Sequence, residues 1–296
     1  MKEAFVLLAC MIACQLFFGG SLIARERDDE ITIVSENHVE IQEKYIRQIY
    51  PEVKNGIEKA LGWKLLSQPT VLLVADKEVF QKMSGNPLIS AFAVPSKHTI
   101  AIDLSSAGFE PYLLHETFEH ELCHLILHDH IRERLLPKWL DEGICQWVSG
   151  SFGEIVVGKG VGVGGSNFSR HPIALQQLED NFPRQKDLLI QAYEESRQFV
   201  DYLVSHYGKE SLLGVLTHLK EGEPIDQAIS KSLSKSLENI QEEWFKDLRS
   251  RHLWLLWASQ YLYEILFVFA ALLTVLAFIR SVMRRRHYEG DEEDEE

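Results

Sequence analysis

An apolar run near the C-terminus constrains the fold of this chain more than any other feature. Residues 261–279 read YLYEILFVFAALLTVLAFI, in which Glu264 is the only charged side chain. These nineteen residues come close to the ~20 that a helix needs to cross the hydrocarbon core of a bilayer. We therefore expect a transmembrane helix rather than a core helix, within a segment that covers residues 253–280.

The residues that flank this run indicate the direction in which it crosses. Two tryptophans and two tyrosines lie at its start, as in the aromatic belts of membrane interfaces, at positions 254, 257, 261 and 263. Four arginines follow, at positions 280, 284, 285 and 286. The positive-inside rule places such a cluster in the cytoplasm. We expect a single pass through the cell membrane and a cytoplasmic tail over residues 281–296, basic and then acidic.

The N-terminus predicts that the middle of the chain is exported. Residues 4–18 read AFVLLACMIACQLFF, after a lysine and before the small residues GGS, which is the layout of a secretory signal. Residues 1–24 are interpreted as a signal peptide or an uncleaved signal anchor, with a lipoprotein site at Cys14 and a buried core helix as alternatives. The signal peptide and the anchor both leave residues 25–252 outside the cytoplasm.

Charge and composition narrow the class of protein. The chain has 30 basic and 44 acidic side chains, and seven of the acids lie in the last eight residues. An acidic body argues against nucleic-acid binding, which needs a basic face. Four cysteines are too few for a disulfide-built scaffold. Cys123 and Cys145, outside the predicted signal, are interpreted as buried core residues, with a disulfide in an oxidising exterior as the alternative.

Residue spacing in the middle of the chain predicts a mixed α and β domain. Runs rich in β-branched residues predict strands, at residues 31–35, 70–75, 91–94 and 98–104. Three- and four-residue apolar spacing predicts helices, at residues 39–61 with a bend or break near Pro51, then 78–83, 111–131, from 137 onward, 173–180, 187–207, 209–219, 224–231 and 237–248. The glycine-rich segment 150–165 lacks the order of a phosphate loop and is interpreted as a flexible loop or hairpin.

One predicted helix carries a possible metal site. Residues 120–124 read HELCH, and residues four apart lie on one face of a helix. The imidazoles of His120 and His124 can therefore bind one zinc ion, Zn²⁺, and Glu121 can take a proton from a water on that ion. Glu142 follows His124 by 18 positions, across a predicted turn that lets the chain return a third ligand.

The stretch around this motif resembles the gluzincin metallopeptidases, in particular the peptidase MA-like group of the thermolysin-like clan. Their pattern H-E-L-x-H, followed by P-x-W-L-x-E-G-x-A, matches residues 120–124 and 137–145, with Cys145 in place of the alanine. Weaker similarity continues downstream and ends near Trp244. The resemblance covers roughly residues 31–248.

This resemblance implies a fold and a set of site residues. The implied fold is α+β, a thermolysin-like zincin domain with a small mixed sheet, an active-site helix and a helical C-terminal subdomain. One strand, 91–94 or 98–104, is expected at the edge of the sheet, where extended substrate pairs. The implied zinc ligands are His120, His124 and Glu142. Glu121 is the implied general base and acid, and Tyr193 is the candidate that polarises the oxyanion, with a buried structural tyrosine as its alternative.

Two residues beside the motif can serve a supporting role. Asp141 or Glu119 could orient an imidazole of the site, because the second N–H of a zinc-bound histidine usually has a partner. His128 and His130 lie past the motif and fit surface or capping roles better.

We expect a zinc-dependent metallopeptidase that cleaves a peptide or protein substrate at the outer face of a membrane. The chain shows no stretch like the G-A-M-E-N of the aminopeptidase branch, which favours an endopeptidase. The main alternative is a membrane-tethered, non-catalytic binding module that retains the zinc site for folding. A receptor-like role for the acidic tail is a further alternative that rests on charge alone.

Overall fold

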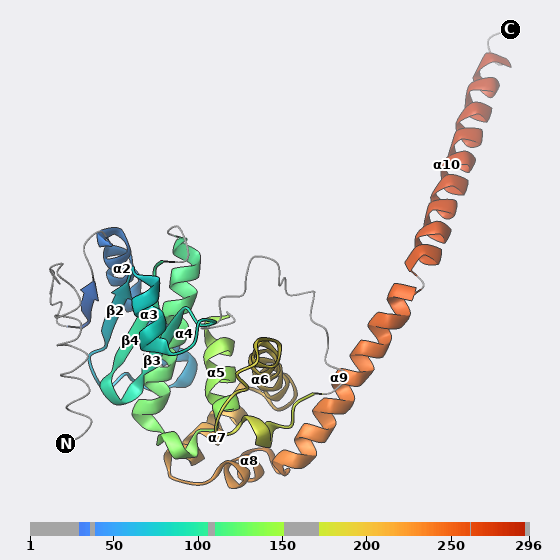
Figure 1. Ribbon diagram of the computed structural model, residues 1–296. Coiled ribbons are helices and arrows are strands. Elements are labelled where there is room, and N and C mark those ends of the chain that lie inside the picture. The colour runs from blue at the N-terminus through green and yellow to red at the C-terminus, as the bar shows by residue number, and fades with distance from the viewer. Residues whose placement is uncertain (1–29, 36–38, 106–109, 151–171, 261, 294–296) are drawn as a thin grey trace, which may run out of the picture. The chain divides into compact units, whose positions relative to one another are not determined.

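The computed structural model describes residues 30–35, 39–105, 110–150, 172–260 and 262–293 (Figure 1). The predicted signal and nearly all of the glycine-rich segment lie outside these ranges. The chain divides into two compact units, Met1–Gln241 and Glu242–Glu296, which are described separately. The division of the sequence at residues 24, 252 and 280 stays a prediction.

The first unit contains a mixed four-stranded sheet in the order β1-β2-β4-β3 (Figure 1). Its strands are β1 (Thr32–Ser35), β2 (Thr70–Val74), β3 (Ala91–Val94) and β4 (Thr99–Asp103). β1, β2 and β4 pair in parallel, whereas β3 pairs with β4 in antiparallel register. Of the two candidates for an edge strand, the structure therefore places 91–94 at the edge and 98–104 inside the sheet.

A tight turn creates this edge. Pro95–Lys97 forms a single 3-10 turn between β3 and β4, and His98 ends it in the left-handed region, with φ 46°. The His98 N–H donates to the carbonyl of Pro95 at 2.9 Å. Because proline presets the first turn position, the chain reverses within a few residues and lays β3 against β4.

Helices make up most of the first unit. They are α2 (Glu40–Leu61), α3 (Lys77–Ser84), α4 (Pro111–His130), α5 (Lys138–Ser149), α6 (Lys186–Tyr207), α7 (Lys209–Lys220) and α8 (Ile225–Leu233), with short 3-10 segments η2 (Glu133–Leu135) and η3 (Leu175–Leu178). α2 continues through Pro51, so of the bend or break expected there, the break does not occur.

The helix predicted at residues 173–180 is wrong, because only the 3-10 turn η3 forms there. Ala174 is extended there, with φ −67° and ψ 134°, and side chains from other helices bind the backbone on either side of it. Glu195 accepts from the N–H of Ile173 at 2.8 Å, and Gln241 accepts from the N–H of Leu175 at 2.7 Å. The segment therefore consists of extended backbone followed by a single 3-10 turn.

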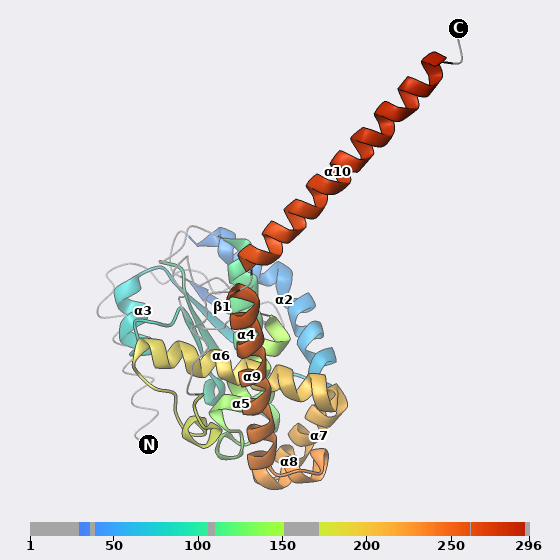
Figure 2. The ribbon, with the colours of Figure 1, turned by 90° about the vertical axis from the view of Figure 1, so that its right-hand side faces the viewer.

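Helix α4 lies between the sheet and α5 (Figure 1). Every residue from Leu122 to Leu127 is buried, which is typical of a helix enclosed on all sides. α5 packs in turn against α6, which runs across it in Figure 2. At Gly143 the two helices approach so closely that a Cβ atom would lie 2.5 Å from the carbonyl oxygen of Ser196.

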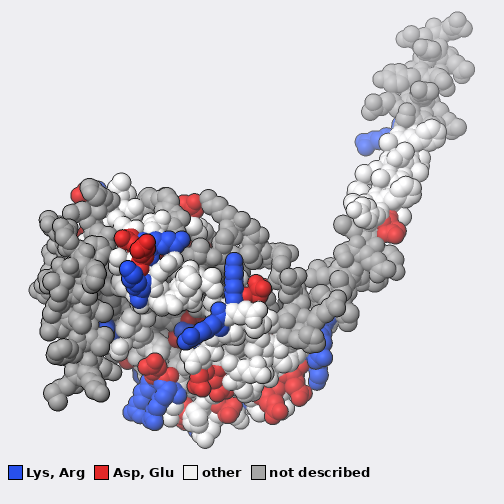
Figure 3. All heavy atoms as spheres, viewed as in Figure 1, with Lys and Arg blue, Asp and Glu red and all other residues white. Residues whose placement is uncertain are grey.

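The second unit consists of helix. α9 (Leu237–Gln260) starts before the unit boundary, and α10 (Leu262–Glu293) follows it. Among the described residues, Tyr263–Arg280 is the stretch long and apolar enough to cross a membrane by length and composition, with a mean hydropathy of 2.0 and all of its side chains exposed. Figure 3 shows it as uncharged spheres between one acidic and one basic residue.

Candidate metal centre

The hairpin of α4 and α5 brings together the side chains of the predicted zinc site. His120 and His124 lie one turn apart on α4, and Glu142 lies on α5. His120 and Glu142 are completely buried, and His124 is 3% exposed. The short connection through η2 reverses the chain, so that the two helices face each other along their buried sides.

Three ligand atoms converge between these helices. Nε2 of His120 lies 3.1 Å from Nε2 of His124. Oε2 of Glu142 lies 3.3 Å from the first of these nitrogens and 3.6 Å from the second. Two imidazole nitrogens and one carboxylate oxygen form the His₂Glu set that holds catalytic zinc in known peptidases. The residues present therefore fit a zinc ion, and the three form a candidate metal site.

Asp141 connects this triad to a third histidine. Its Oδ1 lies 2.7 Å from Nδ1 of His124, and its Oδ2 lies 3.0 Å from Nε2 of His128. A carboxylate at Nδ1 favours the tautomer that leaves Nε2 free to bind a metal. The surface or capping role predicted for His128 is wrong, because this side chain is part-buried against Asp141. The four-residue spacing between His124 and His128 was the signal that could have revealed it.

Burial and neighbouring charges shift the pKa values of the three side chains of the triad. Burial lowers the pKa of His120. Burial alone would lower the pKa of His124 too, but the carboxylates of Asp141 and Glu142 outweigh it and raise that pKa well above its ordinary value. Burial would raise the pKa of Glu142, yet Lys138 and then His124 hold it well below its ordinary value. An ionised carboxylate therefore lies at the centre of the site and favours a positive charge there, either the proton on His124 or a metal ion that replaces it.

Lys138 makes a contact that the sequence did not single out. Its Nζ lies 2.5 Å from Oε1 of Glu142, the carboxylate oxygen that faces away from the two histidines. Lys138 opens α5, and Glu142 follows one turn later. Glu142, the third proposed ligand, thus contacts Lys138 through one carboxylate oxygen and the two histidines through the other.

The other predicted catalytic residues have different surroundings. Glu121 is completely buried on α4, beside His120. Tyr193, on α6, is 4% exposed and packs with its ring edge against Phe182, at a centroid distance of 4.9 Å. It belongs to an apolar cluster with Leu189, which is the environment of a structural tyrosine. A catalytic role for Tyr193 stays a prediction.

The two cysteines lie in the same hairpin. Cys123 and Cys145 are both buried and free, so the alternative of a disulfide between them is not realised. Sγ of Cys145 lies 3.5 Å from Nδ1 of His124. Burial, and then Cys123, raise the pKa of the Cys145 thiol well above its ordinary value, which keeps the thiol protonated and makes it a core side chain.

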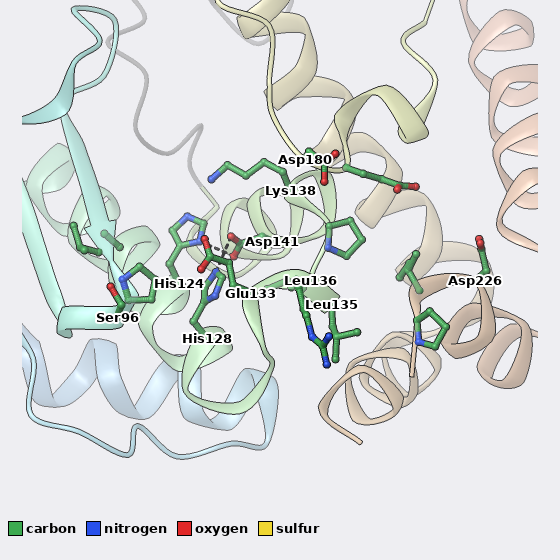
Figure 4. Close-up of a pocket in the computed structure, with 18 residues that line it drawn as sticks. Ser96, His124, His128, Glu133, Leu135, Leu136, Lys138, Asp141, Asp180 and Asp226 are labelled. Atoms are coloured by element: carbon green, nitrogen blue, oxygen red, sulfur yellow. Dashed lines mark hydrogen bonds and ion pairs between the residues drawn. The ribbon is translucent and has the colours of Figure 1, made fainter. Parts of the chain in front are cut away.

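A cavity of about 780 Å³ opens beside the triad (Figure 4). His124, His128 and Asp141 form one wall, and the end of edge strand β3 with the following turn forms another. The remaining lining comes from the α4–α5 connection, from Glu179 and Asp180, and from the start of α8. Figure 4 shows the Lys138 side chain reaching along this cavity toward His124. The candidate metal site therefore borders a space large enough for several side chains of a ligand.

Comparison with known families agrees with this geometry. A model of the Peptidase MA superfamily matches residues 88–250, from just before the edge strand into α9. The match includes the whole α4–α5 hairpin and more than half of the chain. No curated protein matches. The superfamily is one of metallopeptidases, and the matched region contains the candidate His/His/Glu zinc site. The chain therefore belongs to the Peptidase MA superfamily.

Proposed function

We propose that the protein is a zinc-dependent endopeptidase, anchored in a membrane by α10, with its catalytic domain on the outer face. The observation that carries this proposal is the convergence of Nε2 of His120, Nε2 of His124 and Oε2 of Glu142 in the buried hairpin. In the proposed site these three residues hold the zinc ion.

The chain's own residues would supply binding and proton transfer. When bound, zinc acts as a Lewis acid and lowers the pKa of water toward neutrality. Glu121 takes the proton of the attacking water and delivers it to the leaving amine. Asp141 holds the imidazole of His124 through Nδ1 at 2.7 Å. Tyr193 is the proposed donor to the oxyanion.

The cavity supports a peptide as the substrate. An extended peptide can add to the exposed edge of β3 through main-chain hydrogen bonds, and the end of β3 lines the cavity beside His124. A peptide bound along this edge would bring its backbone next to the metal site. The absence of a G-A-M-E-N stretch from the sequence supports internal cleavage over removal of an N-terminal residue.

The membrane part of the proposal rests on α10 and the two ends of the sequence. The apolar stretch Tyr263–Arg280 is long enough to span a bilayer. The arginines that begin at Arg280 support a cytoplasmic tail. The proposed signal at residues 1–24 supports export of the catalytic domain.

One observation favours the alternative of a non-catalytic binding module. His120, Glu121 and Glu142 are completely buried, as expected for a site that only stabilises the fold. Zinc content and turnover must therefore be measured on the same samples.

The test uses the full chain in detergent, as wild type, His120→Ala, Glu121→Gln and, as a control on the same helix, Glu116→Gln. We expect one zinc per chain by elemental analysis in all except His120→Ala. Hydrolysis of a peptide library should fall about 100-fold or more in Glu121→Gln and stay near wild type in Glu116→Gln. A folded wild type that takes up no zinc would refute the proposal. Zinc binding by a wild type that hydrolyses no peptide would leave the binding module, and equal hydrolysis by wild type and Glu121→Gln would refute the role of Glu121.

A further inference from the structure

We propose that Lys138 is a positioning residue that fixes Glu142 for metal binding. This inference rests on the proposed function, since it assumes that Glu142 is the third ligand. Lys138 stands at a position that the family pattern P-x-W-L-x-E-G leaves open, so the motif itself assigns no role to it.

The first argument is that the two oxygens of the Glu142 carboxylate have different partners. Oε1 contacts Nζ of Lys138 at 2.5 Å. Oε2 faces Nε2 of His120 at 3.3 Å and Nε2 of His124 at 3.6 Å. A carboxylate can rotate and present either oxygen or both. The ammonium group binds one oxygen and thereby leaves the other in the ligand triad.

The second argument is that local helix energetics do not explain a lysine here. Lys138 is the first residue of α5, where the helix dipole disfavours a cation. A lysine four residues before a glutamate is also the weaker orientation of a helical ion pair. The pairing with a completely buried carboxylate is therefore what stabilises the side chain in this place.

The third argument concerns access. The Lys138 side chain is 36% exposed and lines the cavity beside the triad (Figure 4). The side chain is therefore partly in contact with solvent, while its Nζ reaches a completely buried carboxylate. This reduces the desolvation cost of the pair compared with a fully buried one.

Two effects of Lys138 on zinc oppose each other. The ammonium repels a dication, which would weaken binding. However, the two cations use different oxygens, so the negative carboxylate lies between them and offsets that repulsion. Residues that orient metal ligands typically contribute about 10- to 100-fold in metal affinity. We therefore expect orientation to dominate, and removal of Lys138 to weaken zinc binding.

The experiment measures zinc affinity of the full chain in detergent by competition with a chromophoric chelator. The variants are Lys138→Met, Lys138→Gln and Lys138→Arg. The matched control is Lys64→Met, because Nζ of Lys64 also lies 2.5 Å from a carboxylate oxygen of a buried glutamate, Glu58, outside the site. We expect the dissociation constant to rise about 10- to 100-fold in Lys138→Met and less in Lys138→Gln. Lys138→Arg, which keeps the charge, and Lys64→Met, which lies outside the site, should bind zinc about as tightly as wild type, without the 10- to 100-fold loss.

Several outcomes would overturn the inference. Unchanged or tighter zinc binding by folded Lys138→Met would do so, and Lys138→Gln gives the same test if the methionine variant does not fold. If KM rises in the Lys138 variants while zinc affinity and kcat stay unchanged, Lys138 acts in substrate binding instead. Wild type and His120→Ala are measured in parallel. If wild type binds no zinc, the proposed function fails with the inference. If wild type binds zinc and His120→Ala does not, but folded Lys138→Met and Lys138→Gln bind zinc as tightly as wild type, the inference alone fails.

Discussion

At the scale of single residues, Glu195 on α6 is a buried carboxylate outside the site. It accepts hydrogen bonds from the N–H of Ile173 at 2.8 Å and from the amide of Gln191 at 2.7 Å. Burial nevertheless raises its pKa from 4.5 to about 7, because the two hydrogen bonds offset only part of the desolvation. The folded protein therefore binds a proton at Glu195 more tightly than the unfolded chain does.

The sign of the resulting pH dependence follows from linkage. A raised folded-state pKa contributes stability that is complete below the unfolded pKa of 4.5 and is lost as the pH rises through about 7. Glu195→Gln does not titrate. We expect its free energy of unfolding, relative to wild type, to increase by up to about 3 kcal/mol between pH 4.5 and pH 8. Urea titrations at both pH values check this, with the exposed Glu210→Gln as a control for the lost charge. If the difference in unfolding free energy between Glu195→Gln and wild type does not change with pH, the raised pKa of Glu195 is contradicted.

The sequence indicated which side chains converge in the candidate metal site and named Asp141 among their possible partners, but it did not indicate the other partners. His120, His124 and Glu142 were proposed from a motif and its spacing, and the structure brings them within 4.8 Å of one another. Lys138 and His128 were not recognised. A lysine at a helix start looks like a solvated residue in sequence, and its contact with Glu142 depends on how deeply α5 is buried.

At the scale of elements, Gly143 sets the distance between α5 and α6. A Cβ atom there would lie 2.5 Å from the carbonyl oxygen of Ser196 and 2.6 Å from Cγ2 of Val200. The first contact is with backbone, which cannot rotate away. The close approach of these helices therefore requires glycine, although glycine lowers the intrinsic stability of α5.

We expect Gly143→Ala to destabilise the protein by about 1–3 kcal/mol, because overpacking outweighs the gain in helix propensity. Gly56→Ala is the matched control, since a Cβ at this position on α2 meets only Glu119 Oε1 at 3.9 Å. That change should stabilise by about 0.5–1 kcal/mol. Denaturant midpoints measure both. If both variants shift the denaturant midpoint equally and in the same direction, close packing at Gly143 does not determine the effect of the added Cβ.

Elements with strong local patterns were predicted well, and those set by distant contacts were not. The helices α4, α6, α7 and α8 begin and end within two residues of their predicted bounds, and α5 begins one residue after its predicted start. The sequence left the edge strand undecided between β3 and β4, because both are apolar and the answer depends on the parallel pairing of β4 with β2. It also extended η3 into a helix, because the side chains of Glu195 and Gln241 that bind its leading backbone come from elsewhere in the chain.

At the scale of the whole molecule, α10 makes the membrane proposal testable. Leu272 and Leu276 lie inside the stretch Tyr263–Arg280 and are exposed. An arginine at the centre of a membrane span costs about 2.5–3.5 kcal/mol. In a chain whose signal at residues 1–24 has been cleaved, we expect Leu272→Arg with Leu276→Arg to move the protein out of the carbonate-resistant membrane fraction, while alanine at both positions leaves it there. Recovery of wild type in the soluble fraction would remove the anchor from the proposal.

The α4–α5 hairpin also bears on the order in which the chain folds. His120 and Glu142 are 22 positions apart, whereas β1 and β2 pair Thr32 with Thr70, and β2 pairs with β4 only after a further crossover. Local contacts form faster than those that must first close a long loop. The hairpin with the proposed ligands can therefore form before the parallel pairing of β1, β2 and β4 is complete.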